Sequence, residues 1–291
     1  MKLPDGFKLR KKRAISYIAC SKLEKAGLAH GFTLRTGGFS KKPYDSLNFG
    51  MHTDDNKKTV RRNILLAEKA IGARIAAAKQ VHGDRIVEVR SPESRHCLSS
   101  GGLAGARSQI QNTEADAVVT DVPGIAASVR VADCAGTIIY DPENKVVAAV
   151  HSGWRGVANK IPAKTVKLMR KKFGSYPAKL LAAVSPAIGP CCFEVGPEVY
   201  KLRRQKVFSN IFTSRKGRVY MDIWKGAVNL LVSAGIKRKN ISVCRMCTSC
   251  NPKLFFSHRR DKGKTGRMMV FGVRTPEARY KEEDAKLETF I

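Results

Sequence analysis

The sequence predicts a mixed α/β or α+β fold that forms one large domain. Strand-like and helix-like runs alternate along the chain, several strands are joined directly by short turns, and no regular strand–helix–strand period is present. The direct joins argue against a doubly wound parallel sheet, which needs a helix between successive strands. A chain of 291 residues can bury a full core, and single α/β domains often exceed about 200 residues.

The first third of the chain contains both kinds of element. Residues 14–34 predict a strand, a short helix and a second strand. Residues 35–40 hold two adjacent glycines and predict a tight loop with exposed backbone N–H groups. Residues 56–73 predict a helix, because their apolar side chains recur at helical spacing. Residues 76–89 predict two strands joined by a turn at His82.

The remainder is strand-rich at first and then mixed. Residues 91–113 are polar and rich in Ser, Gly and Gln, which predicts an inserted loop. Four apolar runs between residues 117 and 153 predict four strands. The elements expected after them are helices at 156–173 and 218–235, a turn entering a helix at 190–205, strands at 179–189 and 241–246, and a hairpin at 254–273.

The composition is that of a globular protein. Hydrophobic residues make up 43% of the chain, which argues against global disorder. No apolar run approaches the ~20 residues needed to span a bilayer, and the short apolar stretch near the N-terminus does not resemble a signal peptide. We therefore expect a cytoplasmic enzyme without a membrane partner.

The charge is strongly basic, with 54 Lys and Arg against 24 Asp and Glu and a formal net charge of +30. Such a field attracts small anions and binds nucleic acid non-specifically. The basic residues are scattered, and no helix-turn-helix, zinc-finger or RRM signature accompanies them, so no specific nucleic-acid partner is expected. Residues 1–13 are predicted to be a basic N-terminal segment, and residues 14–291 a single catalytic domain.

Three side chains could form a reactive site. Cys134 and His151 each end a predicted strand, and His82 lies at a boundary between strand and turn. Two imidazoles and one thiolate with an open fourth position are typical of catalytic zinc, although the same ligands also suit copper. A metal-free alternative is a Cys134 thiolate that uses one of the histidines as its base.

Seven segments resemble, in order, motifs of the YfiH-type family, also called the laccase-domain or polyphenol-oxidase family. They are HGFTLRTGGFSKKPYDSLNFGMHTDD, KQVHGD, EADAVVTD, ADC, VHSGWRG, IGPCCFEVGPEVY and CTSCNPKLFFSHRRDKGKTGRM, between residues 29 and about 273. The resemblance implies a layered α/β/β/α domain like that of the cytotoxic necrotizing factor deamidases. It also implies metal ligands at His82, Cys134 and His151, with zinc as the cofactor and copper as the alternative.

The resemblance further implies an activity. The family is associated with phosphorolysis of purine nucleosides, including adenosine, inosine and methylthioadenosine, and with adenosine deamination. The expected partners are a nucleoside and phosphate, and the expected assembly is a monomer or homodimer. Competing interpretations are a copper polyphenol oxidase, a hydrolase that edits peptidoglycan precursors, and a basic binding protein without activity. Six histidines in the whole chain are too few for a four-copper set, which argues against laccase chemistry.

Individual roles follow from this interpretation. Cys134, His151 and Asp133 are the predicted catalytic residues, with Asp133 as the group that moves protons. The predicted phosphate-binding residues are Arg35, Arg155 and Arg260, and further candidates are Arg259 and Arg267.

Some features of the sequence allow more than one interpretation. Trp154 could stack on a purine or belong to the core. The CxxC formed by Cys247 and Cys250 could join Cys191 and Cys192 in a zinc site, but a Cys247 that lines the pocket is the favoured interpretation. Three departures from the family pattern, Val131, Gly136 and the insertion at 91–113, bear on the shape of the pocket rim and on substrate preference more than on the ligand set.

Overall fold

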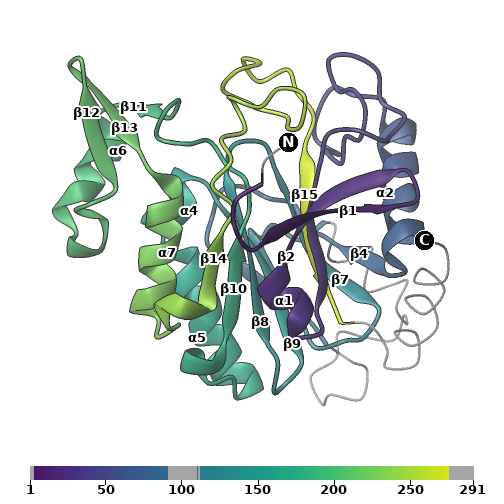
Figure 1. Cartoon of the computed structure of the whole chain (residues 1–291), viewed down its shortest axis with the longest axis horizontal. Helices are drawn as coiled ribbons and strands as arrows, with labels where there is room; N and C mark the ends of the chain where they lie inside the picture. The colour runs from purple at the N-terminus through teal and green to yellow at the C-terminus, as the bar shows by residue number, and fades with distance from the viewer. Residues whose placement is uncertain (1–2, 91–109, 111, 275–291) are drawn as a thin grey trace.

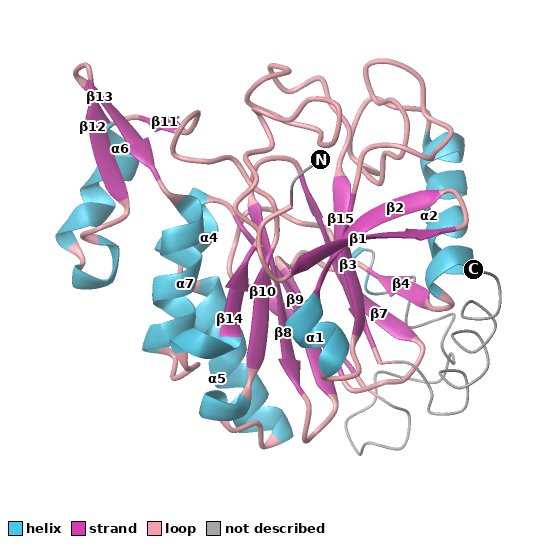
Figure 2. Cartoon of the chain, viewed as in Figure 1, coloured by secondary structure: helices cyan, strands magenta, loops and turns pink. Residues whose placement is uncertain are grey.

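The computed structural model describes residues 3–90, 110 and 112–274 (Figure 1). Two six-stranded sheets pack face to face, and helices cover their outer faces (Figure 2). This confirms the predicted mixed α/β fold and the α/β/β/α layers that the family resemblance implies. The predicted insertion at 91–113 lies almost entirely outside the described residues.

Each of the two six-stranded sheets contains both parallel and antiparallel strand pairs. In spatial order the first sheet contains β1 (Phe7–Lys12), β2 (Ile15–Cys20), β3 (Ala29–Thr33), β15 (Met268–Val273), β7 (Ile125–Val131) and β4 (Arg74–Ala76). The second contains β14 (Ile241–Val243), β10 (Leu181–Val184), β8 (Ala135–Asp141), β9 (Val146–Ser152), β6 (Ala117–Thr120) and β5 (Ile86–Val89). A small third sheet contains β11 (Glu194–Val195), β13 (Arg218–Met221) and β12 (Phe212–Arg215).

The longer helices lie on the outer faces of the two large sheets. The α-helices are α1 (Ser21–Lys25), α2 (Lys57–Ile71), α4 (Trp154–Ala158), α5 (Ile161–Phe173), α6 (Pro197–Tyr200) and α7 (Ile223–Ser233). The 3-10 turns are η1 (Pro177–Lys179), η2 (Lys201–Arg204), η3 (Lys206–Phe208) and η4 (Arg238–Asn240). Helices α5 and α7 cover the second sheet and α2 covers the first (Figure 1). No helix in the described ranges is long and apolar enough to cross a bilayer.

Three hydrophobic clusters fill the spaces between the layers. Strand β9 shows how one sequence serves two of them: Ala148 and Val150 face the helices, whereas Val147 and Ala149 face the first sheet. Successive side chains of a strand point to opposite faces, so a strand between two cores must be apolar throughout. The third cluster joins the first sheet to α2, whose buried side includes Ala67 and Ile71.

The segment between β4 and β5 does not form the expected two-stranded unit. Strand β4 pairs with β7 of the first sheet, whereas β5 pairs with β6 of the second. The chain therefore crosses from one sheet to the other between residues 76 and 86, and His82 lies on this crossing. Alternation of residue types shows that each segment is a strand but does not identify its partner.

Two predicted helices have different limits. The helix expected at 156–173 is two helices, because Lys160 has a left-handed backbone (φ 60°) and Pro162 lies in the first turn of α5, a position that suits proline. The helix expected at 218–235 begins later, because residues 218–221 form strand β13. The side chain of Asp222 accepts a hydrogen bond from the N–H of Lys225 and caps α7.

The predicted hairpin at 254–273 is also wrong. Only residues 268–273 form a strand, β15, and it pairs with β3 and β7 instead of with residues 254–260. Residues 254–267 contain turns at 254 and 258–263 and no strand. At the other end of the chain, β1 pairs along its whole length with β2, so the basic N-terminal segment adds an edge strand to the first sheet.

A buried histidine in β3 gives stability a dependence on pH. The Nε2 of His30 accepts a hydrogen bond from the N–H of Cys20 (2.8 Å), and its Nδ1 lies 2.9 Å from the carbonyl oxygen of Leu28. Burial lowers the pKa of His30 below its ordinary value of 6.5. The unfolded chain therefore binds the proton more tightly than the folded chain does.

The contribution of neutral His30 to the free energy of unfolding should accordingly be fully present above pH 6.5. It should decrease as the pH falls from there through the pKa that His30 has in the folded chain. We expect His30→Gln, which does not take up a proton, to lose less unfolding free energy than the wild type between pH 7 and pH 5. Urea denaturation at each pH measures this difference. Equal losses in the two proteins would contradict the assignment.

Candidate functional site

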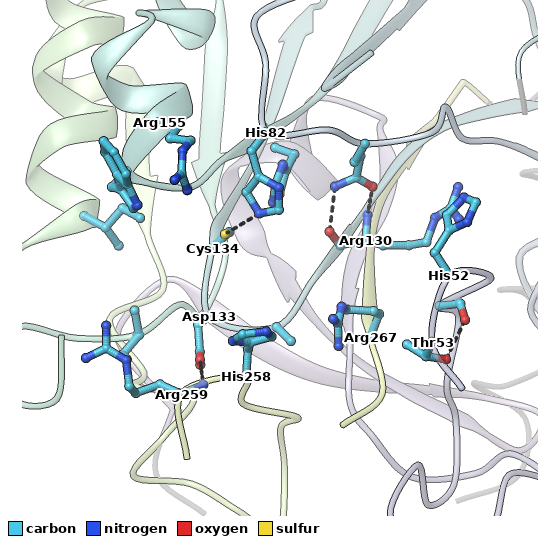
Figure 3. A pocket seen from close by; sticks show the side chains of 18 of the residues that line it. His52, Thr53, His82, Arg130, Asp133, Cys134, Arg155, His258, Arg259 and Arg267 are labelled. Carbon is cyan, nitrogen blue, oxygen red and sulfur yellow. Dashed lines mark hydrogen bonds between the residues drawn. The ribbon is translucent and has the colours of Figure 1, made fainter. Parts of the chain in front are cut away.

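Three side chains from separate segments meet at the seam between the two sheets. His82 comes from the crossing between β4 and β5, Cys134 from the turn between β7 and β8, and His151 from the end of β9. One ligand atom from each lies within 4.8 Å of the other two. The Sγ of Cys134 is 3.9 Å from the Nε2 of His82 (Figure 3). The structure thus brings together the three residues that the sequence singled out.

The backbone around these residues is unusual. His82 and Asp133 both have positive φ angles, 60° and 86°, which non-glycine residues rarely adopt. Gly153 packs directly on the site, since a Cβ atom there would lie 2.9 Å from the Sγ of Cys134. The positive φ angles turn the imidazole and the thiol toward one point, and Gly153 leaves room for them there.

A buried carboxylate, Asp116, positions two of the three residues. Its oxygens accept hydrogen bonds from the N–H groups of Val81, His82 and Gly83 at 2.7–3.2 Å. Its Oδ1 also lies 2.8 Å from the Nδ1 of His151. The Nε2 of His151 is therefore the nitrogen left free for a ligand, and the loop that carries His82 is fixed to the same carboxylate.

Asp116 remains ionised. Desolvation acts to raise its pKa, but hydrogen bonding and charge from His151, together with the backbone N–H donors, outweigh it and lower the pKa below its usual value. This residue was not predicted to be functional from the sequence. The available signal was an aspartate directly before the apolar strand β6, inside the motif EADAVVTD.

Cys134 and His151 each shift the pKa of the other. Burial on its own would raise the pKa of Cys134, but His151 and His82 lower it to about 6. Burial would likewise lower the pKa of His151, yet the charges of Cys134 and Asp116 raise it to about 9. Cys134 is thus a thiolate at neutral pH, which is the form that binds metal.

This donor set fits a catalytic zinc ion. Zinc in such sites takes three protein ligands of the N, S or O type and leaves one position for water or substrate. Here the three donors face an open cavity, and a carboxylate behind His151 sets its orientation. Imidazole and thiolate donors also suit copper.

The cavity has a volume of about 470 Å³, within the range of about 300–1,000 Å³ usual for small-molecule sites. One part of its wall is apolar and contains Trp154, Ile188, Phe193 and Ile223. Cationic side chains line it as well, and Figure 3 shows them on both sides of His82 and Cys134. They are Arg130, Arg155, Arg259 and Arg267.

The cations are poorly neutralised. Burial lowers the pKa of Arg130 to about 10, and no carboxylate pairs with it among the residues that the structure describes. Partial burial lowers the pKa of His52 as well, with a further contribution from the charges of Arg130 and Lys79. A cavity with this field favours an anionic ligand.

Comparison with known proteins identifies the family. A family model described as "Multi-copper polyphenol oxidoreductase laccase" matches residues 29–274. The chain belongs to this family. It is 32% identical over 248 residues to a protein of Bacillus subtilis named purine nucleoside phosphorylase YlmD, and the match covers 83% of this chain and 86% of that protein.

A Geobacillus stearothermophilus protein of the same name is 32% identical over 276 residues, with 92% and 97% of the two chains covered. The crystal structure of YlmD from that organism superposes with a TM-score of 0.82 and 31% identity, over 94% of this chain and all of that one. The residues that the family model matches include the whole second sheet, the first sheet except β1 and β2, and every segment of the candidate site.

The structure distributes the predicted phosphate ligands differently. Arg155 lines the cavity, whereas Arg35 and Arg260 are not among its lining residues. Arg35 donates to the carbonyl groups of Asp45 and Pro252. Arg260 forms a two-point ion pair with its neighbour Asp261 and donates to backbone carbonyls. The guanidinium groups of Arg35 and Arg260 therefore brace loops, and phosphate binding by these two arginines stays a prediction.

Asp133 lines the cavity but is heavily engaged. Its Oδ1 accepts a hydrogen bond from the hydroxyl of Thr248 at 2.5 Å, and its Oδ2 accepts one from the N–H of Arg259 at 2.6 Å. Both carboxylate oxygens are therefore already engaged by donors of the chain. The geometry thus favours a positioning role for Asp133 over the proton transfer expected from the sequence.

Trp154 and Cys247 differ in their relation to the cavity. Trp154 lines it, and the centre of its ring lies 4.4 Å from the guanidinium carbon of Arg155. Cys247, favoured from the sequence as a pocket residue, is not among the lining residues and lies beside Cys191 and Cys250 instead.

Replacement of Asp116 tests how far the site depends on it. Asp116→Asn should weaken zinc binding about 10- to 100-fold, because an amide has one acceptor oxygen where the carboxylate has two. Competition with a chromogenic chelator measures the affinity. Asp84→Asn, a nearby exposed aspartate paired with Lys164, is the matched control and should leave affinity unchanged; an equal loss in both variants would contradict the role of Asp116.

Proposed function

We propose that this protein is a purine nucleoside phosphorylase whose substrates bind in the cavity next to His82, Cys134 and His151. The observation that carries the proposal is the combination, in one cavity, of an apolar aromatic wall, several arginines and a three-residue metal-ligand set. The names of the Bacillus and Geobacillus relatives support it. Adenosine, inosine and methylthioadenosine are the proposed nucleosides.

The apolar wall suits the purine. Phe193 offers a flat aromatic ring, Ile188 adds apolar surface, and Trp154 adds a second aromatic ring. Ile188 and Phe193 belong to the same buried cluster as Trp224, whose indole donates to the carbonyl oxygen of Ser185 at 3.0 Å. A planar base packed here would leave its sugar pointing toward the cationic part of the cavity.

The arginines suit phosphate. Guanidinium groups bind phosphate oxygens through two parallel hydrogen bonds. Arg155 is the strongest candidate, because it is exposed to the cavity and has no carboxylate partner among the described residues. Arg267 is less free, because its guanidinium donates to the carbonyls of Thr265 and Gly266.

In the proposed reaction a phosphate oxygen attacks the sugar C1′, and the bond from C1′ to the purine nitrogen breaks. The electron pair of that bond moves to the purine, which takes up a proton, and the products are the free base and ribose 1-phosphate. The chain must orient phosphate, stabilise the charge on the departing base and deliver that proton. His258, which lines the cavity, is the proposed proton donor.

We propose zinc as the ion held by His82, Cys134 and His151, with copper as the alternative. Zinc supplies a Lewis acid and lowers the pKa of bound water. The residues of the chain keep the donors in place: Asp116 fixes the His151 ring, and the Cys134 thiolate contributes a negative charge that retains the ion.

Deamination of adenosine is a second proposed activity of the same cavity. It needs an activated water and a group that moves protons, as in nucleobase deaminases. The donor set with an open position supports the first requirement. Both carboxylate oxygens of Asp133 already accept hydrogen bonds, from Thr248 and Arg259, so deamination ranks below phosphorolysis here.

Product analysis with a metal-ligand variant tests the proposal. Wild-type protein incubated with adenosine and phosphate should form adenine and ribose 1-phosphate, and any deamination should appear separately as inosine and ammonia. Cys134→Ala should abolish these products, because it removes one metal ligand. Cys244→Ala removes a buried cysteine outside the site and should retain activity. Persistent turnover by Cys134→Ala would contradict the proposal.

The phosphate site makes a separate prediction. Arg155→Gln should raise the KM for phosphate about tenfold or more, since a charged hydrogen bond contributes about 1.5–3 kcal/mol, and should change the KM for the nucleoside much less. Initial rates at varied phosphate measure this. Arg61→Gln, an exposed arginine outside the cavity, is the control; similar phosphate KM values for both variants would show that Arg155 does not bind phosphate.

A further inference from the structure

A second group of sulfur atoms lies outside the cavity, between the loop after β10 and the loop after β14. Its members, called the four-cysteine cluster below, are Cys191, Cys192, Cys247 and Cys250. All four sulfur atoms lie within 4.8 Å of one another. The Sγ of Cys250 is 3.6 Å from that of Cys191 and 3.4 Å from that of Cys192.

These distances fit one metal ion and do not fit a disulfide. A disulfide places its two sulfurs about 2.05 Å apart, and all four cysteines are free thiols. Four thiolates around one zinc ion, each at about 2.3 Å in a tetrahedron, lie roughly 3.8 Å from one another. In a [4Fe–4S] cluster each cysteine binds a different iron atom, so the sulfurs would be spread more widely.

The two loops that carry the cysteines are already joined by backbone contacts. The N–H of Gly189 donates to the Sγ of Cys247 at 3.2 Å, a contact that stabilises a thiolate. The N–H of Thr248 donates to the carbonyl oxygen of Ala187 at 3.0 Å, and Arg215 donates to the carbonyl oxygen of Cys191. These hydrogen bonds fix the backbones of the two loops relative to each other and hold the sulfur of Cys247 in place.

We propose that the four-cysteine cluster is a second metal site and that it binds one structural Zn²⁺ ion. Soft thiolate ligands in a tetrahedral set select zinc among the common divalent ions. Four protein ligands leave no position for a substrate, which is the arrangement of structural zinc and not of catalytic zinc. This site is separate from the His82–Cys134–His151 set, because none of its four cysteines lines the cavity.

The ion would hold the wall of the cavity in place. Thr248, between the two cysteines of the CxxC, donates to the carboxylate of Asp133, and the N–H of Ile188 donates to the carbonyl oxygen of Asp133. Ile188 and Phe193 flank the Cys191–Cys192 pair and line the cavity. Zinc bound to the cluster would thus link the two loops that contact Asp133.

Metal content of the full chain, purified without added metal, tests the proposal. The experiment starts from the His82→Ala variant. This substitution removes one of the three ligands of the first site, so any metal found in the protein is assigned to the four-cysteine cluster. This variant should retain about one zinc per chain. Adding Cys250→Ser should remove that zinc, whereas adding Cys244→Ala should not. Absence of zinc from the His82→Ala protein, or iron in its place, would overturn the proposal.

X-ray absorption covers the case in which the cysteine variants fail to fold. The zinc edge of the His82→Ala protein should show four sulfur neighbours at about 2.3 Å and no nitrogen neighbour. A shell containing nitrogen or oxygen would overturn the proposal. Failure of the product assay for phosphorolysis would leave this result unchanged, so the two proposals are tested independently.

Discussion

The candidate site depends on a single buried carboxylate. Asp116 connects the beginning of β6, the loop that crosses between the sheets and the end of β9, through three backbone donors and one imidazole. The four hydrogen bonds offset the cost of burying the charge of this carboxylate. Removing one of the partners would leave a buried polar group without a hydrogen bond, which destabilises the site. The position of His82 relative to His151 follows from this one group.

The layered architecture explains why the site lies where it does. The crossing between β4 and β5 passes from the first sheet to the second, and the turn between β7 and β8 does the same. His82 and Cys134 lie on these two crossings, and His151 ends the central strand beside them. Side chains that would be distant in one sheet are thereby brought to the same edge of a two-sheet sandwich.

Much of this could be predicted from the sequence. Soft metal ligands at strand ends, combined with motifs in the family order, identified His82, Cys134 and His151. Helix α2 was predictable because two independent signals coincide. Its apolar residues recur at helical spacing, and the run is bounded by Asn56, which caps the N-terminus, and by Gly72 in a left-handed conformation. In these cases local residue preference and tertiary structure favour the same result.

The failures share a cause, which is dependence on partners far away in the chain. Arginines look alike in sequence, and only the fold separates Arg155, in the cavity, from Arg35, which braces a loop. Asp116 is marked by no spacing rule, since its donors lie 33 to 35 residues earlier. Cys191 and Cys250 are 59 residues apart, so the pattern of a single CxxC understated what surrounds it.

The arginines of the cavity have a consequence for the release of the product of the proposed reaction. A guanidinium attracts any phosphate group, whether it is inorganic or already esterified to a sugar. The sugar phosphate formed in the cavity would therefore leave against the same attraction that drew phosphate in. The two anions would therefore compete for the same side chains, and added salt would shorten the stay of both by screening the charges.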